Sequence, residues 1–222
     1  ITHMNALDTD LYLRIATEIY LKRAVVGGVD RVFEMNRNFR NEGMDSSHSP
    51  EFTSLEAYEA YSDYNGMADL TRDLIQQAAR DAFDLSEGEE IVRLADGTEY
   101  DLSGQWDRID LYGSTSEALG EEITVETPRE TLVKHAERIG LEVDDYAVSG
   151  KIVEDIFEEL VASKLWAPTF VYDFPEDTSP LTRYHRSRPG LTEKWDLYVR
   201  GFETGTAYSE LADPVVQRER FE

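Results

Sequence analysis

The chain has 222 residues, a formal net charge of −24 and no cysteine. This length can bury a substantial core and fits one large domain or slightly more than one. The missing cysteines exclude a disulfide framework, a thiolate zinc site and a cysteine nucleophile. The acidic excess argues against general adhesion to nucleic acid, because phosphate backbones need a basic surface. Any contact with RNA is therefore expected to be local.

The N-terminal residues ITHMNALDTD have neither a basic region nor an apolar region of the signal-peptide type. No apolar run approaches the roughly 18 residues that a membrane span needs. These two observations predict a soluble, cytoplasmic protein. The five lysines, against a larger number of arginines, fit either a GC-rich genome or a salt-adapted surface.

In chain order, Leu11 to Ala16 reads as a short strand, and Thr17 can cap a helix that ends at Gly27-Gly28. Apolar and polar residues then alternate from Arg31 to Arg40 and from Glu51 to Tyr61. This period of two predicts two strands, which form a hairpin with a long loop.

The next segment changes to helical spacing, which predicts a helix over Asn65 to Leu85. Ile91 to Leu102 reads as a small hairpin that turns at Asp96-Gly97. In TPRE, Thr127 is the predicted N-cap of a helix that runs to about Gly140. A further helix is predicted from the apolar spacing of residues 152–161.

Two strand-rich stretches follow, Ala167 to Pro175 and Trp195 to Leu211. We expect them to join the first hairpin in one sheet, with residues 65–165 as a mainly helical insertion outside it. The predicted division is therefore 1–64, 65–165 and 166–222, within an α+β fold.

Each strand of the first hairpin has two faces, because residues two apart in an extended chain point the same way. One face is polar and consists of Glu34, Asn36, Asn38, Arg40, Phe52, Ser54, Glu56 and Tyr58. The opposite face is apolar and holds Phe33, Met35, Phe39, Leu55 and Ala57.

The polar face, together with the loop residues Glu42 and His48, has the parts of a site for a charged, flat ligand. Arg40 can hold phosphate, Phe52 can stack, and carboxylates can meet an amine. The alternative is a surface hairpin whose polar face meets only water. Two aromatic rings on that face and the long loop favour the ligand site.

Residues Phe39 to Thr53, read as FRNEG…HSPEFT and followed by Glu56 and Tyr58, resemble motif 2 of bacterial class II lysyl-tRNA synthetases. The resemblance extends upstream through LYLRIATEIYLKRAVVGGVDRVFE and downstream through SPLTRYHRSRPGLTEKWDLYVRGFETGTAYSELADPVVQRERF. It implies the α+β catalytic fold of class II aminoacyl-tRNA synthetases, an antiparallel sheet flanked by helices. The segment TAYSELADP makes the resemblance specific, since the wider class shares FRNE.

The resemblance implies that the protein is a lysine-tRNA ligase, which activates lysine with ATP and transfers it to the 3′ end of tRNA(Lys). Such an in-line displacement at phosphorus needs charge neutralisation and positioning more than a protein nucleophile. Arg40 matches the catalytic motif 2 arginine that holds the α-phosphate and the lysine carboxylate. The family's ATP site maps to Arg40, Glu42, His48, Phe52, Asp196 and Glu203.

For Mg²⁺, the resemblance implies Asp196 and Glu203 as the metal-binding carboxylates. Asp196 stands where many family members have Glu. The lysine site maps to Glu18 for the α-amino group, to Arg40 for the carboxylate, and to Glu56, Tyr58, Tyr208 and Glu210 around the side chain. Carboxylates at two depths and aromatic walls suit a ligand with an ammonium at each end.

Motif 1, motif 3 and the anticodon-binding barrel are expected to lie outside this sequence, which would make it an internal piece of a catalytic domain from a homodimeric parent. Three alternatives stay open. The chain could belong to a paralogue that lysylates elongation factor P, or to an enzyme that lysylates phosphatidylglycerol. It could also be an inactive nucleotide-binding module.

Overall fold

The computed structural model describes residues 2–41, 43–44 and 48–222. The chain separates into two compact units, residues 1–62 and 63–222. The predicted division into a motif 2 part, a helical insertion and a block of site strands stays a prediction.

The first unit is built around a long antiparallel hairpin that follows one short helix. A smaller hairpin precedes the helix, and β3 pairs with β4 from Arg31 opposite Glu59 to Phe39 opposite Glu51. Its elements are β1 (Thr2–Met4), β2 (Thr9–Leu11), α1 (Glu18–Val26), β3 (Arg31–Phe39) and β4 (Glu51–Glu59). The predicted long hairpin is therefore confirmed.

The predicted strand Leu11 to Ala16 is wrong, because β2 ends at Leu11 and residues 12–16 are outside any strand. Leu13 and Ile15 are each 66% exposed, so their alternation has no face to bury. Helix α1 does begin after Thr17, and it ends at Val26 with Gly27 as its C-cap. The threonine hydroxyl makes no capping hydrogen bond there, and it is buried without a partner among the described residues.

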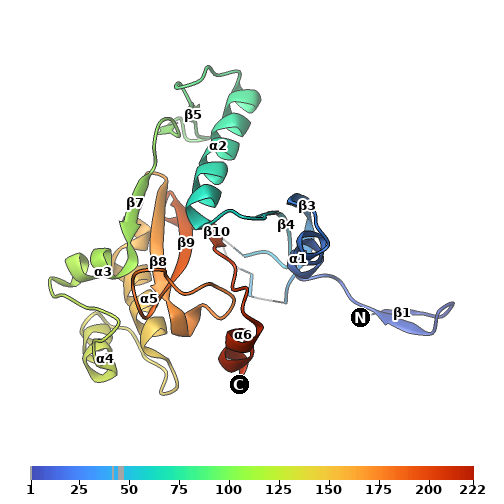
Figure 1. Ribbon diagram of the computed structural model, residues 1–222. Helices are drawn as coiled ribbons and strands as arrows, with labels where there is room; N and C mark the ends of the chain where they lie inside the picture. Colours follow the sequence, from blue (N-terminus) through green and yellow to red (C-terminus); the bar gives the residue numbers. More distant parts are fainter. Residues whose placement is uncertain (1, 42, 45–47) are drawn as a thin grey trace. The chain divides into compact units, whose positions relative to one another are not determined.

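The second unit contains a four-stranded sheet, a two-stranded hairpin and five α-helices within the described residues (Figure 1). None of the described helices has the length and apolar character that crossing a membrane requires. The elements are α2 (Tyr64–Phe83), β5 (Ile91–Arg93), β6 (Glu99–Asp101), β7 (Asp107–Asp110), α3 (Leu111–Leu119), α4 (Arg129–Arg138), α5 (Ser149–Leu160), η1 (Ala162–Lys164), β8 (Thr169–Pro175), η2 (Glu176–Thr178), β9 (Leu191–Val199), β10 (Phe202–Tyr208) and α6 (Pro214–Phe221).

The larger sheet has the strand order β10-β9-β8-β7, and the β3–β4 hairpin forms a sheet of its own. The expectation of one sheet containing all four predicted strands is therefore wrong. The predicted insertion is also not entirely outside the sheet, because β7 pairs in parallel with β8. A parallel pair needs a long crossover, and α3, α4 and α5 lie between these two strands in the sequence.

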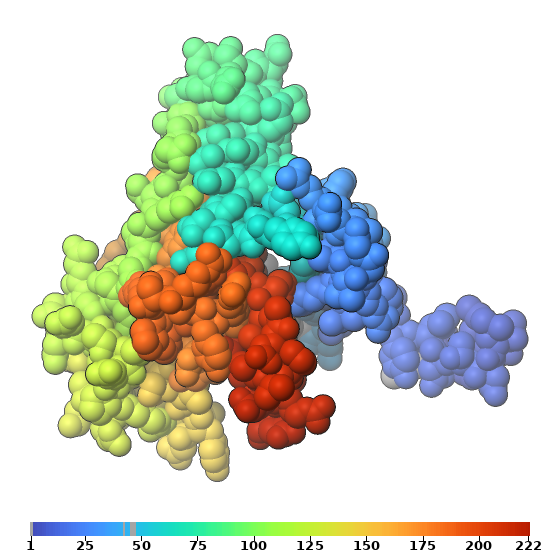
Figure 2. Space-filling model, viewed as in Figure 1, coloured from blue at the N-terminus to red at the C-terminus, as the bar shows by residue number. Residues whose placement is uncertain are grey.

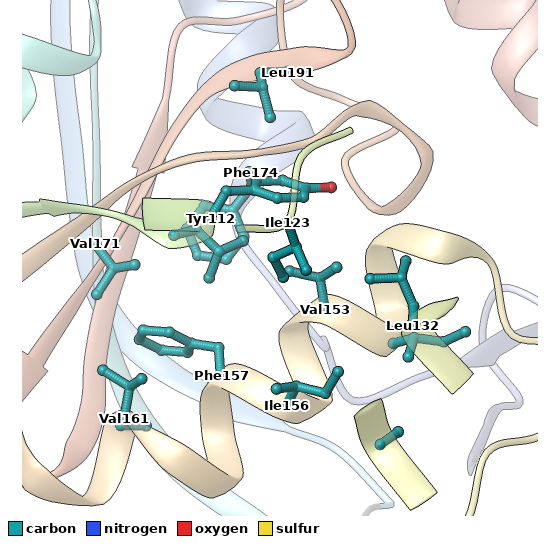
Figure 3. Packing of buried hydrophobic residues seen from close by; sticks show 14 of the residues in the cluster. Tyr112, Ile123, Leu132, Val153, Ile156, Phe157, Val161, Val171, Phe174 and Leu191 are labelled. Atoms are coloured by element: carbon teal, nitrogen blue, oxygen red, sulfur yellow. The ribbon is translucent and has the colours of Figure 1, made fainter. Parts of the chain in front are cut away.

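Strand β8 is buried at every residue, because the sheet has apolar side chains on both faces. On one face, Val153, Ile156 and Phe157 of α5 pack with Val171 of β8 and with Tyr112 of α3 (Figure 3). The other face carries a second cluster, in which Trp195 and Leu197 of β9 pack with Tyr64 and Ala68 of α2. Because both faces of the sheet are buried, it is fixed which residues of β9 face α2 and which face α5.

The predicted helices over residues 65–85, 127–140 and 152–161 are confirmed as α2, α4 and α5, with shifted ends. The predicted cap Thr127 is wrong, since α4 begins at Arg129 after Pro128. The Thr127 hydroxyl instead accepts a hydrogen bond from the Thr124 backbone N–H at 2.8 Å, which closes the preceding turn. The small hairpin at Asp96-Gly97 is confirmed as β5–β6.

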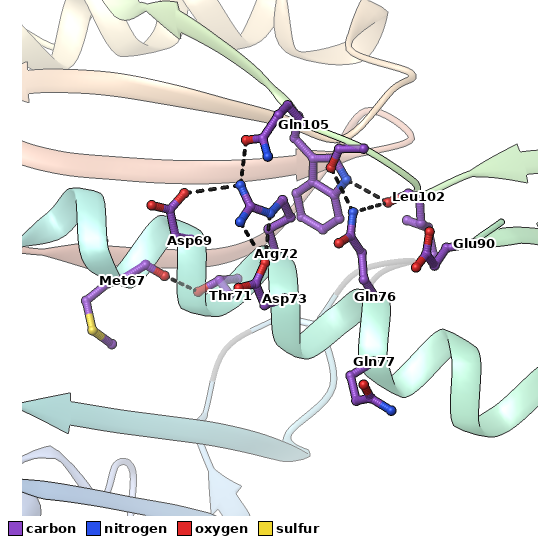
Figure 4. Close-up of polar contacts among 12 residues, drawn as sticks. Met67, Asp69, Thr71, Arg72, Asp73, Gln76, Gln77, Glu90, Leu102 and Gln105 are labelled. Atoms are coloured by element: carbon purple, nitrogen blue, oxygen red, sulfur yellow. Dashed lines mark hydrogen bonds and ion pairs between the residues drawn. The ribbon is translucent and has the colours of Figure 1, made fainter. Parts of the chain in front are cut away.

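Gln76 ties α2 to the loop that leads into β7 (Figure 4). Its amide Nε2 is buried and donates to the carbonyl oxygens of Leu102 at 2.7 Å and Gly104 at 2.9 Å. The Trp106 indole N–H also donates to the Leu102 carbonyl, at 2.9 Å. On the neighbouring turn, Arg72 donates to Gln105 at 2.6 Å.

Replacement of Gln76 by Leu should lower the free energy of unfolding by about 1–3 kcal/mol, because the carbonyls of Leu102 and Gly104 both lose the Gln76 amide donor. Gln77→Leu is the matched control, since Gln77 is exposed on the same helix. It should change stability by less than about 0.5 kcal/mol. Urea unfolding followed by circular dichroism measures both, and equal effects would contradict the role of Gln76.

Candidate functional site

The polar face of the β3–β4 hairpin consists of the residues that were predicted to form it. Glu34 lies opposite Glu56, Asn36 opposite Ser54, and Asn38 opposite Phe52. The Asn38 amide donates to the Ser54 hydroxyl at 2.5 Å. The side chains that sequence periodicity assigned to one face are therefore neighbours across the two strands.

This polar face is better covered than the apolar one. Asn38 is 1% exposed, whereas Phe33 is 72% exposed and Met35 67% exposed on the opposite face. The segment before and at the start of α1 covers the polar side, where the Thr17 backbone N–H donates to Glu56 Oε1 at 3.2 Å. The alternative in which the polar face meets only water is therefore wrong.

Arg40 follows the end of β3 and lies beside Phe52. The guanidinium carbon is 5.2 Å from the Phe52 ring centroid, and Nε donates to the Ile15 carbonyl at 3.2 Å. A cation beside an aromatic plane can meet a phosphate and a flat base together. His48 lies exposed in the loop, and Glu42 falls outside the described residues.

On β4, hydrogen bonds from neighbouring groups, among them Tyr58, orient the carboxylate of Glu56. The Tyr58 hydroxyl donates to Glu56 Oε2 at 3.2 Å, while Oε1 accepts from Thr17. Both carboxylate oxygens are thus oriented by neighbours. Glu18, at the start of α1, accepts a hydrogen bond from Lys22 Nζ at 2.6 Å. Both glutamates can act as acceptors for an amine.

A cavity of about 240 Å³ lies in the second unit between α5 and the sheet. Its wall combines carboxylates with aromatic rings. The lining residues are Glu154, Phe157, Glu158, Phe174, Lys194, Asp196, Tyr198, Glu203, Thr206 and Tyr208.

Two β-bulges direct side chains into this cavity. In β10 the register shifts between Glu203 and Gly205, so Glu203 lies opposite Tyr198 while Thr206 lies opposite Asp196. Without that extra residue, Glu203 and Thr206 would point to opposite faces. Glu203 thereby joins Asp196 on one side of the sheet.

The second register shift falls between Tyr172 and Phe174 of β8, where Asp173 alone stands opposite two residues of β9, Glu193 and Lys194. Tyr172 belongs to the cluster on the α2 face, and Phe174 to the cluster on the α5 face. Asp173 between them has φ of 65°, a left-handed conformation that aspartate tolerates better than most residues. The bulge places the Phe174 ring in the cavity wall.

Negative charge dominates the cavity. Asp196 is 4% exposed, and its Oδ2 accepts from Lys194 Nζ at 2.8 Å. The same ammonium lies 3.8 Å from the Phe174 ring centroid. Although part of Glu203 reaches solvent, burial of its carboxyl, followed by the charge of Asp196, raises the pKa of Glu203 to about 7. Burial also raises the pKa of Glu154.

These carboxylates fit a hard divalent cation. Asp196 Oδ1 is buried and has no hydrogen-bond partner among the described residues, which is costly for a carboxylate unless a ligand meets it. Asp196 and Glu203 supply the oxygen donors that Mg²⁺ prefers, one or two to a site. The part of the chain that the structure describes holds no cluster of three or more His, Asp or Glu side chains arranged for a metal.

The structure brings some predicted residues together and adds others. Tyr208 lines the cavity with Asp196 and Glu203, whereas Glu210 is not among the lining residues. Sequence reasoning missed Glu154 and Glu158, whose spacing of four on α5 places them on one helix face. It also missed Lys194, which comes just before the strand predicted from Trp195, and Phe174, whose side cannot be read from alternation because the register shifts before it.

The whole chain matches a known family and known proteins. The family model "tRNA synthetases class II (D, K and N)" matches residues 1–222. A lysine--tRNA ligase from Kineococcus radiotolerans is 61% identical over 222 residues, all of this chain and 44% of that protein. One from Mycolicibacterium gilvum is 61% identical over 224 residues, with the same coverage of 100% and 44%.

A third relative is a lysylphosphatidylglycerol biosynthesis bifunctional protein, LysX, from Gordonia bronchialis. It is 51% identical over 223 residues, which are 99% of this chain and 19% of that protein. The chain spans less than half the length of the lysine--tRNA ligases it matches. Because the family model covers every residue, the chain belongs to the class II tRNA synthetases of the D, K and N group.

Proposed function

We propose that the protein containing this chain is a lysine-tRNA ligase, which forms lysyl-adenylate from lysine and ATP and transfers the lysyl group to tRNA(Lys). The identity of 61% to lysine--tRNA ligases over the whole chain carries this proposal. It exceeds the 51% identity to the LysX protein. The oriented carboxylates and the cation-aromatic pair on the hairpin give it chemical support.

For activation, the α-carboxylate of lysine attacks the α-phosphorus of ATP, and pyrophosphate leaves with the electrons of the broken P–O bond. Arg40 would neutralise charge on the α-phosphate and the carboxylate, as a guanidinium can contact two oxygens at once. Phe52 would stack on adenine, with Glu42 and His48 as further ATP contacts. A ribose hydroxyl of the tRNA 3′ end then attacks the lysyl carbonyl, and AMP leaves.

Magnesium would be held by Asp196 and Glu203. When bound, it would supply positive charge to the ATP phosphates. The cavity's buried, unpaired Asp196 oxygen supports this assignment. Lys194, already paired with Asp196, would limit the negative charge before a cation arrives.

Lysine specificity would rest on carboxylates that repel an acidic side chain and accept an ammonium. Glu18 would receive the α-amino group. Glu56 and Glu210 would meet the side-chain ammonium, with Tyr58 and Tyr208 as walls for the methylene stem. That Glu56 and Glu210 enter one cleft stays a prediction, as do a cytoplasmic location and a homodimer.

The second candidate is a lysyl transferase that acts on phosphatidylglycerol, which the similarity to LysX favours. Transfer to elongation factor P and an inactive nucleotide-binding module are further alternatives from the sequence. All of the active candidates begin with lysyl-adenylate. They differ in the molecule that accepts the lysyl group.

Lysine-dependent exchange of pyrophosphate into ATP tests activation, and acceptor assays then separate the candidates. The full-length protein should exchange pyrophosphate with lysine and charge tRNA(Lys), while phosphatidylglycerol vesicles should gain no lysine. Formation of lysyl lipid, with or without charged tRNA, would favour the phosphatidylglycerol candidate, and lysylated elongation factor P without charged tRNA would favour the paralogue. Absence of exchange would contradict the proposal and favour the inactive module.

Arg40→Ala should raise the activation barrier by about 3 kcal/mol, on the order of the loss of one oxyanion donor, with little change in thermal stability. Arg37→Ala is the matched control, because Arg37 is exposed on β3, three residues before Arg40, and pairs with Glu51. Exchange kinetics and thermal unfolding measure the two variants. Near-normal exchange in Arg40→Ala, or its unfolding, would contradict the assignment.

Glu210→Gln should weaken lysine binding roughly a hundredfold or more, because losing one member of a buried charge pair costs about 2–5 kcal/mol. ATP affinity should stay nearly unchanged, since its proposed contacts are Arg40, Phe52 and the metal carboxylates. Isothermal titration with each ligand separately checks this. Equal losses for lysine and ATP would show that Glu210 holds the fold instead.

A further inference from the structure

Residues 181–183, which precede β9, pair with residues 209–211, which follow β10. The Arg183 backbone N–H donates to the Ser209 carbonyl at 2.9 Å, and the Leu211 N–H donates to the Leu181 carbonyl at 3.0 Å. These two bonds flank an antiparallel bridge in which Thr182 lies directly opposite Glu210. The backbone position of Glu210 therefore depends on where residues 179–184 lie.

Arg220 of α6 holds that segment. Its Nη1 donates to the Ser179 carbonyl at 2.9 Å and to the Thr182 carbonyl at 2.6 Å. The guanidinium carbon lies 4.2 Å from the Tyr184 ring centroid. One turn earlier, Gln217 Nε2 donates to the Pro180 carbonyl at 3.1 Å. In Figure 2 the red surface of α6 lies against the orange surface of the preceding segment.

The contact between Arg220 and residues 179–184 has a cost in folding free energy that a purely stabilising contact would avoid. Arg220 Nη2 is buried and has no hydrogen-bond partner among the described residues. A buried guanidinium nitrogen without an acceptor is unfavourable. Ser179 and Thr182, whose carbonyls it holds, are 5% and 2% exposed. The geometry is thus suited to fixing two carbonyls in place.

We propose that Arg220 is a positioning residue for the lysine side-chain site, acting through residues 179–184 on the backbone of Glu210. The inference rests on the proposed function, in which Glu210 meets the lysine ammonium. Arg220 itself would touch no substrate. A carboxylate displaced by about 1 Å loses much of its interaction with a cation, so a distant contact can change substrate affinity strongly.

The test uses the full-length protein and compares Arg220→Ala, Arg220→Lys, Gln217→Ala and the control Arg218→Ala. Arg218 is exposed on the same helix. Pyrophosphate exchange gives KM for lysine and for ATP separately, and thermal unfolding reports stability. Glu210→Gln is included as the reference for loss of the lysine contact.

Arg220→Ala should raise the lysine KM by about tenfold to a hundredfold and change the ATP KM by less than about twofold. Arg220→Lys, which keeps one donor to the carbonyls, should recover part of the loss. Gln217→Ala should raise the lysine KM by a smaller factor. Arg218→Ala should match the parent.

An unchanged lysine KM in Arg220→Ala, with a raised one in Glu210→Gln, would overturn this inference alone. An equal rise in both KM values would also overturn it, since that pattern indicates a structural role. An unchanged lysine KM in Glu210→Gln would overturn the lysine assignment and this inference with it. If Arg220→Ala does not fold, Gln217→Ala decides, because an unchanged lysine KM there would contradict the proposal.

Discussion

Burial of β8 and β9 on both faces is the constraint on which the second unit depends. Trp195 and Leu197 must face α2, because the apolar cluster there holds them, and the residues that alternate with them along β9 must therefore face α5. That alternation puts Lys194 and Asp196 in the cavity wall. If β9 slipped by one residue, the residues that face α2 and those that face α5 would change places. The free-energy cost of burying Lys194 and Asp196 against α2 prevents this slip.

The bulges refine this arrangement. Alternation alone would send Glu203 and Thr206 to opposite faces, yet both line the cavity because β10 contains one unpaired residue between them. The register shift between Tyr172 and Phe174 leaves Asp173 outside the paired positions, and Asp173 accepts from the Tyr64 hydroxyl at 3.1 Å and pairs with Arg188 at 2.6 Å. Irregular positions in the strands thus supply side chains to polar sites that a regular sheet could not reach.

The two polar groups of the protein are built by different means. On the β3–β4 hairpin, cross-strand register places Glu56 opposite Glu34 and Phe52 opposite Asn38, so local sequence contains most of the needed information. The Thr17 N–H that orients Glu56 comes from outside the hairpin. In the cavity, a helix, three strands and the chain around η2 must meet, and the Thr178 hydroxyl reaches Glu154 at 2.6 Å across 24 residues. Chemistry that needs several carboxylates near one another draws them from several elements, because a single strand presents only every second residue to one face.

The sequence by itself determined the long hairpin, its two faces, most helices and the family, since period, spacing and motif are local properties of the chain. It misplaced the strand at Leu11 to Ala16, because the exposed Leu13 and Ile15 have no face to bury. It misplaced the cap at Thr127, because that hydroxyl accepts from Thr124 in the preceding turn. Only the tertiary structure decided that β7 pairs in parallel with β8, that the hairpin forms its own sheet, and that Glu154 and Phe174 face the same cavity. Strand pairing and bulge position depend on contacts between residues far apart in sequence, and the alternation of apolar and polar residues is the same whichever partner a strand takes.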